Sequence, residues 1–313
     1  MNSMNFNQEW YGSQAKVLTQ APDCIVVDYG CNGRGIVKNY NLFEGIQLCF
    51  LDFNTDETMV SKKFNSDIIQ ITHCRSGRYE CEFLNHTVSY LPEGYFGTEY
   101  LPISFSFPLK KYIGVSLVID KQALSDETRK MMKAISIDLD KIGTTLGIEK
   151  KWYVNETPPK LQHLFSELYE VDEAESMGYF KIKAIELLYY MDQLTQLNGY
   201  DFKYFDKKQI QSTKAIREYL ITHLDEKVSL ERLAKNAHLN LSVFHMIFAH
   251  IYGDTPYSHL KKYKMNLAAQ MLTDGQVKIG DIALELGYSN ASKFAKAFQS
   301  VYGVLPKDYR KNS

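Results

Sequence analysis

Lysine and serine side chains recur at helical spacing near the end of the chain, where their ammonium and hydroxyl groups could donate hydrogen bonds to an anionic partner. The stretch NASKFAKAFQSVYGVLP (290–306) contains Ser292, Lys293 and Lys296. A related stretch, NLSVFHMIFAHIYGDTP (240–256), lies fifty residues earlier, and seven of the seventeen aligned positions are identical. The two lysines have no counterpart in the first copy. The repeat therefore predicts one scaffold that is used twice with different exposed residues.

Helix start and stop signals surround both copies. Ser229, Asn240 and Thr255 with Pro256 are suited to the first positions of helices. Four glycines stand where helices should end: Gly253, Gly275, Gly287 and Gly303. Each copy then forms the second of two short helices joined by a short turn. We expect two helix-turn-helix units, bridged by a helix over 256–272.

The second helix of such a unit enters the major groove of DNA, where residues near its start meet base edges. Phe244, Ile247, Phe248 and Ile251 follow the spacing of a buried stripe. The positions left to face DNA are Ser242, Val243, His245 and Met246 in the first copy, and Ala291, Ser292, Lys293, Ala295 and Lys296 in the second. Because the first copy lacks lysine, we expect it to contribute mainly apolar contacts.

The charge distribution supports an anionic partner for the C-terminal third. Residues 210–313 contain 14 Lys+Arg and 9 Asp+Glu, a net charge of +5, whereas the whole chain carries −1 and the remainder therefore −6. Local positive charge is what neutralisation of DNA phosphates requires. The candidate phosphate contacts are Lys235, Lys261, Lys262, Lys264, Lys278, Lys307 and Arg310, together with Lys296.

The N-terminal part has a different periodicity. Residues 24–118 contain short β-rich runs separated by turns, and in GRYECEF (77–83) the residues Tyr79, Cys81 and Phe83 alternate with charged ones. DIIQITHC (67–74) is predicted as a separate strand. The strands suggest a small barrel or double-sheet roll over about 20–120. Helical spacing follows over 121–197, and a linker is expected at 198–209.

The two longest helices of this part, at about 158–169 and 176–197, are long enough either to cover the barrel or to pair with a second copy of the chain. A broad apolar stripe in the second helix consists of Phe180, Ile182, Ile185, Leu188, Tyr189 and Leu194. Both interpretations remain open at this point.

The segment from about 210 to 310 resembles the DNA-binding domain of the AraC/XylS family of bacterial transcription regulators. The resemblance rests on SLERLAKNAHLNLSVFHMIF and on IGDIALELGYSNASKFAKAF, with the pairs Leu233-Ala234 and Ile282-Ala283 and the closing Pro306, Tyr309 and Arg310. It implies an α+β fold, in which a cupin-like β barrel with packing helices (1–200) senses an effector and the all-α domain 210–313 binds DNA. Where the family often has arginine, this chain has Met246.

The function implied is an effector-responsive transcriptional activator in the cytoplasm, with neither catalytic nor metal-binding residues and no cofactor. Its partners would be double-stranded DNA, a small-molecule effector, RNA polymerase and a second copy of the chain, without a membrane, because no signal peptide or spanning stretch is visible. Arg78, Tyr79 and Phe83 are the barrel positions expected to meet the effector.

Three alternatives follow from the same residues. A cupin-type metal enzyme fused to DNA-binding helices would use His73, Glu80 and Glu82, although their spacing fits no metal motif. A thiol or metal sensor would use Cys74 and Cys81 with His73 and His86, whereas the odd number of five cysteines favours reduced thiols. In the third, the first helix-turn-helix unit contacts RNA polymerase or a corepressor, and only the second reads DNA.

Overall fold

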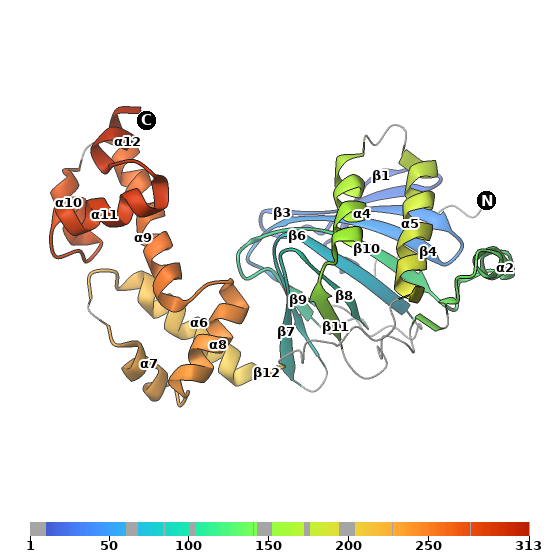
Figure 1. Cartoon of the computed structure of the whole chain (residues 1–313), viewed down its shortest axis with the longest axis horizontal. Coiled ribbons are helices and arrows are strands. Elements are labelled where there is room, and N and C mark those ends of the chain that lie inside the picture. The colour runs from blue at the N-terminus through green and yellow to red at the C-terminus, as the bar shows by residue number, and fades with distance from the viewer. Residues whose placement is uncertain are drawn as a thin grey trace. The chain divides into compact units, whose positions relative to one another are not determined.

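The structure, a computed structural model, divides into two compact units, 1–204 and 205–313 (Figure 1). It describes residues 11–60, 68–83, 86–99, 104–139, 141–142, 152–171, 176–193, 204–226, 228–275 and 277–312. Half of the expected linker, residues 198–203, lies outside these ranges. The helix expected to open the C-terminal domain at Ile210 begins at Lys207.

Antiparallel strands form the N-terminal unit, in two sheets that share one strand. The first sheet has the order β1-β2-β3-β4-β10-β6-β8-β11, and the second has the order β7-β6-β9-β5. The strands are β1 Lys16–Gln20, β2 Cys24–Asp28, β3 Arg34–Phe43, β4 Ile46–Asn54, β5 Thr58–Val60, β6 Ile68–Glu82, β7 Thr87–Pro92, β8 Tyr95–Glu99, β9 Ser104–Ser106, β10 Lys111–Asp120 and β11 Tyr153–Glu156.

Strand β6 passes from one sheet to the other near Gly77. The two runs predicted as separate strands are thus one strand of 15 residues. Gly77 has φ of +86°, and a Cβ atom there would lie 1.8 Å from the carbonyl oxygen of Lys111. Only glycine fits this conformation and this close approach. The strands thus form an antiparallel roll of two sheets, as predicted.

The roll encloses a filled core. Val37, Phe53 and Tyr112 from the first sheet pack with Tyr79 and Leu91 around the second. The rings of Phe53 and Phe107 stack with centroids 4.5 Å apart. The inside of the roll is therefore packed with aromatic side chains.

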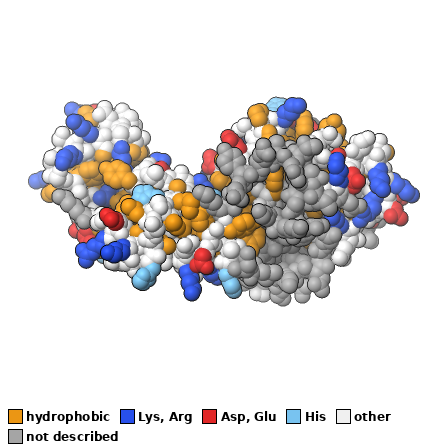
Figure 2. Space-filling model, turned by 60° about the horizontal axis from the view of Figure 1, so that its bottom comes forward, with side chains coloured by type: hydrophobic (Ala, Val, Ile, Leu, Met, Phe, Trp, Pro, Cys, Tyr) orange, Lys and Arg blue, Asp and Glu red, His pale blue; other side chains and the backbone are white. Residues whose placement is uncertain are grey.

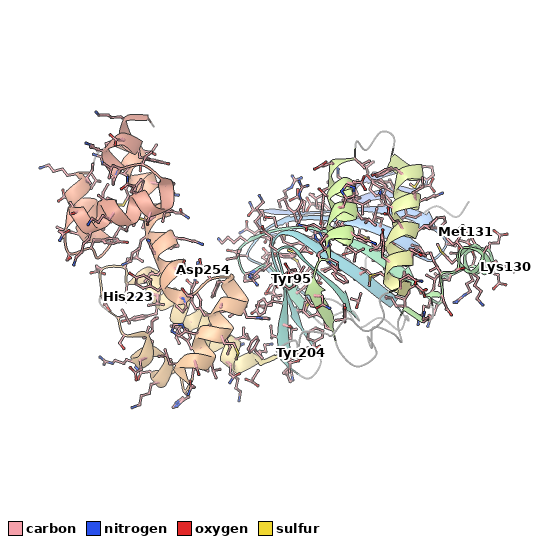
Figure 3. The ribbon with its side chains drawn as sticks, in the orientation of Figure 1. Tyr95, Lys130, Met131, Tyr204, His223 and Asp254 are labelled. Atoms are coloured by element: carbon pink, nitrogen blue, oxygen red, sulfur yellow. The ribbon has the colours of Figure 1, made fainter. Side chains whose placement is uncertain are left out.

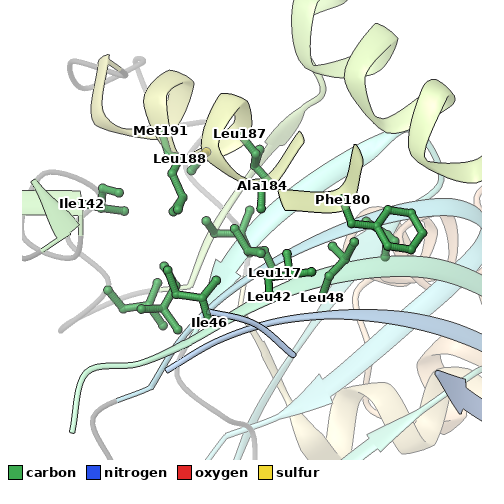
Figure 4. Packing of buried hydrophobic residues seen from close by; sticks show 14 of the residues in the cluster. Leu42, Ile46, Leu48, Leu117, Ile142, Phe180, Ala184, Leu187, Leu188 and Met191 are labelled. Atoms are coloured by element: carbon green, nitrogen blue, oxygen red, sulfur yellow. The ribbon is translucent and has the colours of Figure 1, made fainter. Parts of the chain in front are cut away.

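A second core lies between the opposite face of the first sheet and the helices α4 Pro159–Glu170 and α5 Ser176–Gln193. Phe180, Ala184 and Leu187 of α5 pack toward Leu48 and Leu117 of the sheet (Figure 4). The short helix α2 Asp126–Ala134 adds Met132, which is fully buried. Burial of side chains on both faces fixes the sheet between the two cores.

Part of the apolar stripe predicted on α5 does not face the sheet. Phe180 and Leu188 are buried as expected, but Ile182 is 64% exposed and Tyr189 is 47% exposed. The stripe is wider than the face that one sheet can cover, so its outer edge remains on the surface.

Helices make up nearly all of the C-terminal unit. They are α6 Lys207–Thr222, α7 Leu230–Asn236, α8 Leu241–Tyr252, α9 Pro256–Thr273, α10 Ile279–Glu285, α11 Ala291–Tyr302 and α12 Pro306–Asn312, preceded by the two-residue strand β12 Phe205–Asp206. The α+β class and the bridging helix, α9, are confirmed. Among the described residues, no helix combines the length and apolar character needed to cross a membrane.

Candidate nucleic-acid interface

Helix α8 begins at the predicted cap. The Asn240 side chain accepts hydrogen bonds from the Ser242 backbone N–H at 2.9 Å and from the Ser242 hydroxyl at 2.6 Å. Gly253 ends the helix with φ of +75°. Phe244, Ile247, Phe248 and Ile251 are fully buried, so the predicted stripe is confirmed. This stripe fixes which side of α8 can face a partner.

Helix α11 repeats this arrangement with a more exposed face. The Asn290 side chain accepts from the Lys293 backbone N–H at 2.9 Å, and Gly303 ends the helix with φ of +76°. Phe294 and Phe298 are fully buried. Three polar residues of the opposite side are exposed: Ser292, Lys293 and Lys296. Ala291 is exposed beside them, and Ala295 is half-buried.

The partner-facing side of α8 is less open. Ser242 is exposed, but Val243, His245 and Met246 are half-buried. His250, the other histidine of this helix, lies edge-on to Phe205 with ring centroids 5.0 Å apart. The first copy therefore presents little charge, as the sequence indicates.

Lysine and arginine side chains are distributed over the surface of the C-terminal unit, with apolar side chains between them (Figure 2). Of the predicted phosphate contacts, Lys235, Lys278 and Lys307 are exposed, and Lys261 is half-buried. Lys262 is exposed but lies 2.7 Å from the carboxylate of Asp254, between α8 and α9 (Figure 3). The ammonium groups of these lysines are therefore exposed or partly exposed to solvent.

Two of the predicted phosphate contacts point into the domain. The Lys264 ammonium donates a hydrogen bond to the carbonyl oxygen of Leu224 at 2.6 Å, and burial lowers its pKa. The Arg310 guanidinium donates to the carbonyl oxygen of Val277 at 2.6 Å. Both satisfy carbonyl groups at chain turns. The sequence predicted that both side chains contact phosphate. It could not reveal these hydrogen bonds, because the acceptor residues lie far away in the sequence.

Sequence reasoning missed a half-buried histidine that packs against α8. His259 of α9 packs against Phe248 and Tyr252, with centroids 5.4 and 5.0 Å away, and accepts a hydrogen bond from Arg217 of α6 at 3.3 Å. Burial, reinforced by Arg217, lowers its pKa to about 4. The neutral ring joins α6, α8 and α9 and holds the first unit together. The position of this histidine, one turn into an amphipathic helix, was the feature of the sequence that could have indicated its contact with α8.

The predicted effector residues of the roll lie in different surroundings. Tyr79 is 7% exposed and its ring packs 5.5 Å from that of Tyr112, inside the filled core. Phe83 contacts Trp152, with centroids 5.7 Å apart. Arg78 is half-buried, and burial lowers its pKa.

The residues of the enzyme and sensor alternatives have other partners. His73 stacks on Phe165 at 4.2 Å, facing the helices. Glu80 accepts a hydrogen bond from Ser106 at 2.9 Å, and Glu82 from Ser104 at 3.1 Å.

The five cysteines form no disulfide bond with one another, and burial raises the pKa of Cys49 and of Cys74 to about 12. Over the described ranges, no group of three or more His, Cys, Asp or Glu side chains is placed to hold a metal ion.

Comparison with known proteins identifies the C-terminal unit. Residues 233–312 match the family described as "Helix-turn-helix domain". The chain is 31% identical over 108 residues to "Probable transcriptional regulator LumQ" of Photobacterium leiognathi. The aligned segment covers 34% of this chain and 44% of that protein. It is 35% identical over 82 residues to the "RCS-specific HTH-type transcriptional activator RclR" of Escherichia coli, covering 26% and 29%.

Among solved structures, the C-terminal domain of AraT, a response regulator from Geobacillus stearothermophilus, is 25% identical, with a TM-score of 0.31 and coverage of 33% of this chain and 85% of that one. The chain spans less than half the length of the two curated relatives. The match to the helix-turn-helix family falls on the two capped units described above. Residues 233–312 are therefore similar to the helix-turn-helix domains of transcription regulators, which is the resemblance to the AraC/XylS family that the sequence indicates.

Proposed function

We propose that the chain regulates transcription by placing α8 and α11 in successive major grooves of one DNA duplex, and that it acts by binding, without catalysis. The observation that carries the proposal is the exposed face of α11. Ser292, Lys293 and Lys296 lie there, opposite the buried Phe294 and Phe298. A rigid helix with donors on one side and a core on the other is the form in which proteins read base edges.

The base-facing positions are those predicted on the two helices. On α11 these are Ala291, Ser292, Lys293, Ala295 and Lys296. On α8 they are Ser242, Val243, His245 and Met246, of which the apolar members contact thymine methyl groups. Phosphate contacts come from Lys235, Lys261, Lys262, Lys278 and Lys307, all at least partly exposed. Lys264 and Arg310 serve the domain's own turns instead.

The test starts from a random duplex library, because the target sequence is not known. Full-length protein selects binding sites, which are then examined by hydroxyl-radical footprinting. We expect two protected segments about one helical turn apart on one face of the duplex. Absence of any selected sequence would refute the proposal. Protection of a single segment would instead favour the alternative in which the first unit contacts RNA polymerase or a corepressor.

Residues 1–200 are proposed to sense a small-molecule effector, and 210–313 to transmit the signal to DNA as an activator that contacts RNA polymerase. The curated relative RclR is named a transcriptional activator, which supports this direction. A reporter gene placed downstream of a selected binding site measures whether the chain activates or represses transcription. We expect transcription to fall when the gene for this chain is deleted, and a rise would identify a repressor.

A homodimer formed through α5 is also proposed. Ile182 and Tyr189 are separated by two helical turns, lie on one side of α5 and are exposed there. Apolar exposure of this kind favours pairing with an equal surface. Sedimentation equilibrium of the full chain is expected to give a dimer. Ile182→Glu should shift it toward the monomer, whereas Lys130→Glu on α2 should not.

A further inference from the structure

A cavity of about 250 Å³ opens on the helix-covered face of the first sheet. Its floor comes from β3, β4 and β10, where Ile36, Asp52 and Ile113 are neighbours in register. Its roof comes from the last turn of α4 and from Phe180 near the start of α5. Phe180 also marks one end of the packed cluster between α5 and the sheet (Figure 4). The cavity thus begins where helix-to-sheet packing ends.

One side of the cavity is aromatic. The Phe180 ring lies 4.8 Å from that of Tyr40 and 5.3 Å from that of Phe50. All three residues line the cavity. Their rings meet at angles of 61° and 46°, so they support one another as a fixed wall. Such a wall offers apolar contact to the body of a ligand.

The other side is cationic. Arg34, Lys38 and Arg75 line the cavity against a single carboxylate, that of Asp52, a local net charge of +2 from three cations and one anion. Arg34 lies 2.5 Å from Asp52, which orients it. Arg75 stacks over the Tyr169 ring at 4.8 Å, an arrangement that leaves the guanidinium N–H groups directed outward in their own plane.

We propose that this cavity binds a small organic anion with an apolar body, an amphipathic carboxylate, and that this ligand is the effector of the regulator. That the ligand is the effector rests on the proposed function. Arg75 and Lys38 would hold the carboxylate, because guanidinium and ammonium groups form charge-assisted hydrogen bonds with it. Tyr40, Phe50 and Phe180 would cover the apolar body. None of Arg78, Tyr79 and Phe83 lines this cavity.

A ligand in this position would connect the sheet to the ends of both covering helices. Tyr169 of α4 lines the cavity, and its hydroxyl lies 3.1 Å from His73 Nδ1 of β6. His73 in turn stacks on Phe165, one helical turn earlier in α4. Binding would therefore stabilise the seating of α4 and α5 on the sheet. The ligand would then bind more tightly to the arrangement in which both helices are seated on the sheet than to any other. A ligand can shift a conformational equilibrium only through such a difference in affinity.

The experiment is a calorimetric titration of the full chain with decanoate and with decanamide, which has the same alkyl chain but no charge. We expect decanoate to bind roughly tenfold or more tightly than decanamide, the worth of a charge-assisted hydrogen bond. Arg75→Gln and Lys38→Gln should each remove most of this preference. Lys16→Gln, on β1 of the same sheet and outside the cavity, is the matched control and should change nothing.

A second variant tests the volume independently of charge. Ile36→Trp would fill the cavity while leaving the three cations in place, and should weaken both ligands. Circular dichroism and thermal unfolding of each variant verify that it is folded. Equal affinity for decanoate and decanamide, or wild-type binding by Ile36→Trp or by Arg75→Gln, would overturn the proposed site.

The same preparation is assayed with the selected DNA. Absence of DNA binding, with and without decanoate, would refute the regulatory function while leaving the titration result intact. Conversely, DNA binding without decanoate binding would overturn the cavity proposal alone. A change in DNA affinity upon saturation with decanoate, lost in Arg75→Gln, is the result expected if the ligand is the effector.

Discussion

The ammonium of Lys264 and the carbonyl oxygen of Leu224 are joined by a hydrogen bond of 2.6 Å that spans forty residues of sequence. Lys264 belongs to the bridging helix α9, and Leu224 follows the end of α6. The ring of Tyr288, in the turn between α10 and α11, lies 5.7 Å from the same ammonium. This lysine therefore connects the segment that follows α6 to the turn of the second helix-turn-helix unit.

Gly287 should be intolerant of substitution because it approaches the same carbonyl group. Its φ is +74°, and an added Cβ would lie 2.3 Å from the Leu224 oxygen. Gly303 is the matched control, since its φ is +76° but nothing lies within 4 Å of its added Cβ. We expect Gly303→Ala to lower the free energy of unfolding by about 1 kcal/mol, and Gly287→Ala by clearly more. Urea unfolding measures both, and equal losses would show that the turn relaxes freely.

Lys264→Met should reduce stability without changing how DNA binding depends on salt. Methionine keeps much of the apolar stem but leaves the Leu224 carbonyl without its donor, a loss of about 1 to 3 kcal/mol. A residue that contacts phosphate would instead reduce the slope of log affinity against log salt. Both quantities are measured on the same protein. A lower salt slope in Lys264→Met would restore the phosphate contact predicted from sequence.

Lys296→Ala should weaken DNA binding more than Met246→Ala. Lys296 is exposed on α11 and can donate to a base or a phosphate, whereas Met246 is half-buried on α8 and cannot donate. Titration of a selected duplex at several salt concentrations measures affinity and slope, and the slope should fall by about 1 if Lys296 meets a phosphate. Lys208→Ala, an exposed lysine of α6, controls for general charge loss. The reverse order of the two variants would assign the leading role to α8.

Local signals explain which features could be predicted from the sequence. Asn240 caps α8, and Gly253 and Gly303 end α8 and α11 in the left-handed conformation, as predicted. Caps and glycine stops depend on a few neighbouring residues, so they are readable without a structure. The buried phenylalanine stripes follow in the same way from helical spacing.

Features that depend on distant residues could not be predicted. The inward direction of Lys264 requires the position of Leu224, forty residues earlier. Strand β6 continues through Gly77 because Lys111 of β10 lies beside it, although glycine next to an apolar run suggests a break. The cavity is formed by residues between Arg34 and Phe180, and the three cations that line it are not close in sequence.

Acid should destabilise the N-terminal unit through His73. Burial, reinforced by Arg75, lowers its pKa from the usual 6.5 to about 4. The unfolded chain therefore binds a proton at a higher pH than the folded one does. The free energy of unfolding is therefore unaffected by ionisation of this histidine above about pH 6.5. It falls as the pH decreases from 6.5 toward 4, by an amount on the order of 3 kcal/mol.

The variant His73→Gln tests this directly, because glutamine can still hydrogen-bond to Tyr169 but does not titrate. Urea unfolding of the full chain at pH 7, 6, 5 and 4.5 should give a steeper fall in stability for the wild type than for the variant. The difference between the two isolates the effect of His73 from those of the carboxylates and of His259, whose pKa is also lowered. His86→Gln serves as the control, since that side chain is 77% exposed. Parallel pH profiles for the wild type and His73→Gln would mean that the ring ionises as readily in the folded chain as in the unfolded one. In that case the stack on Phe165 must open to water well before the domain unfolds.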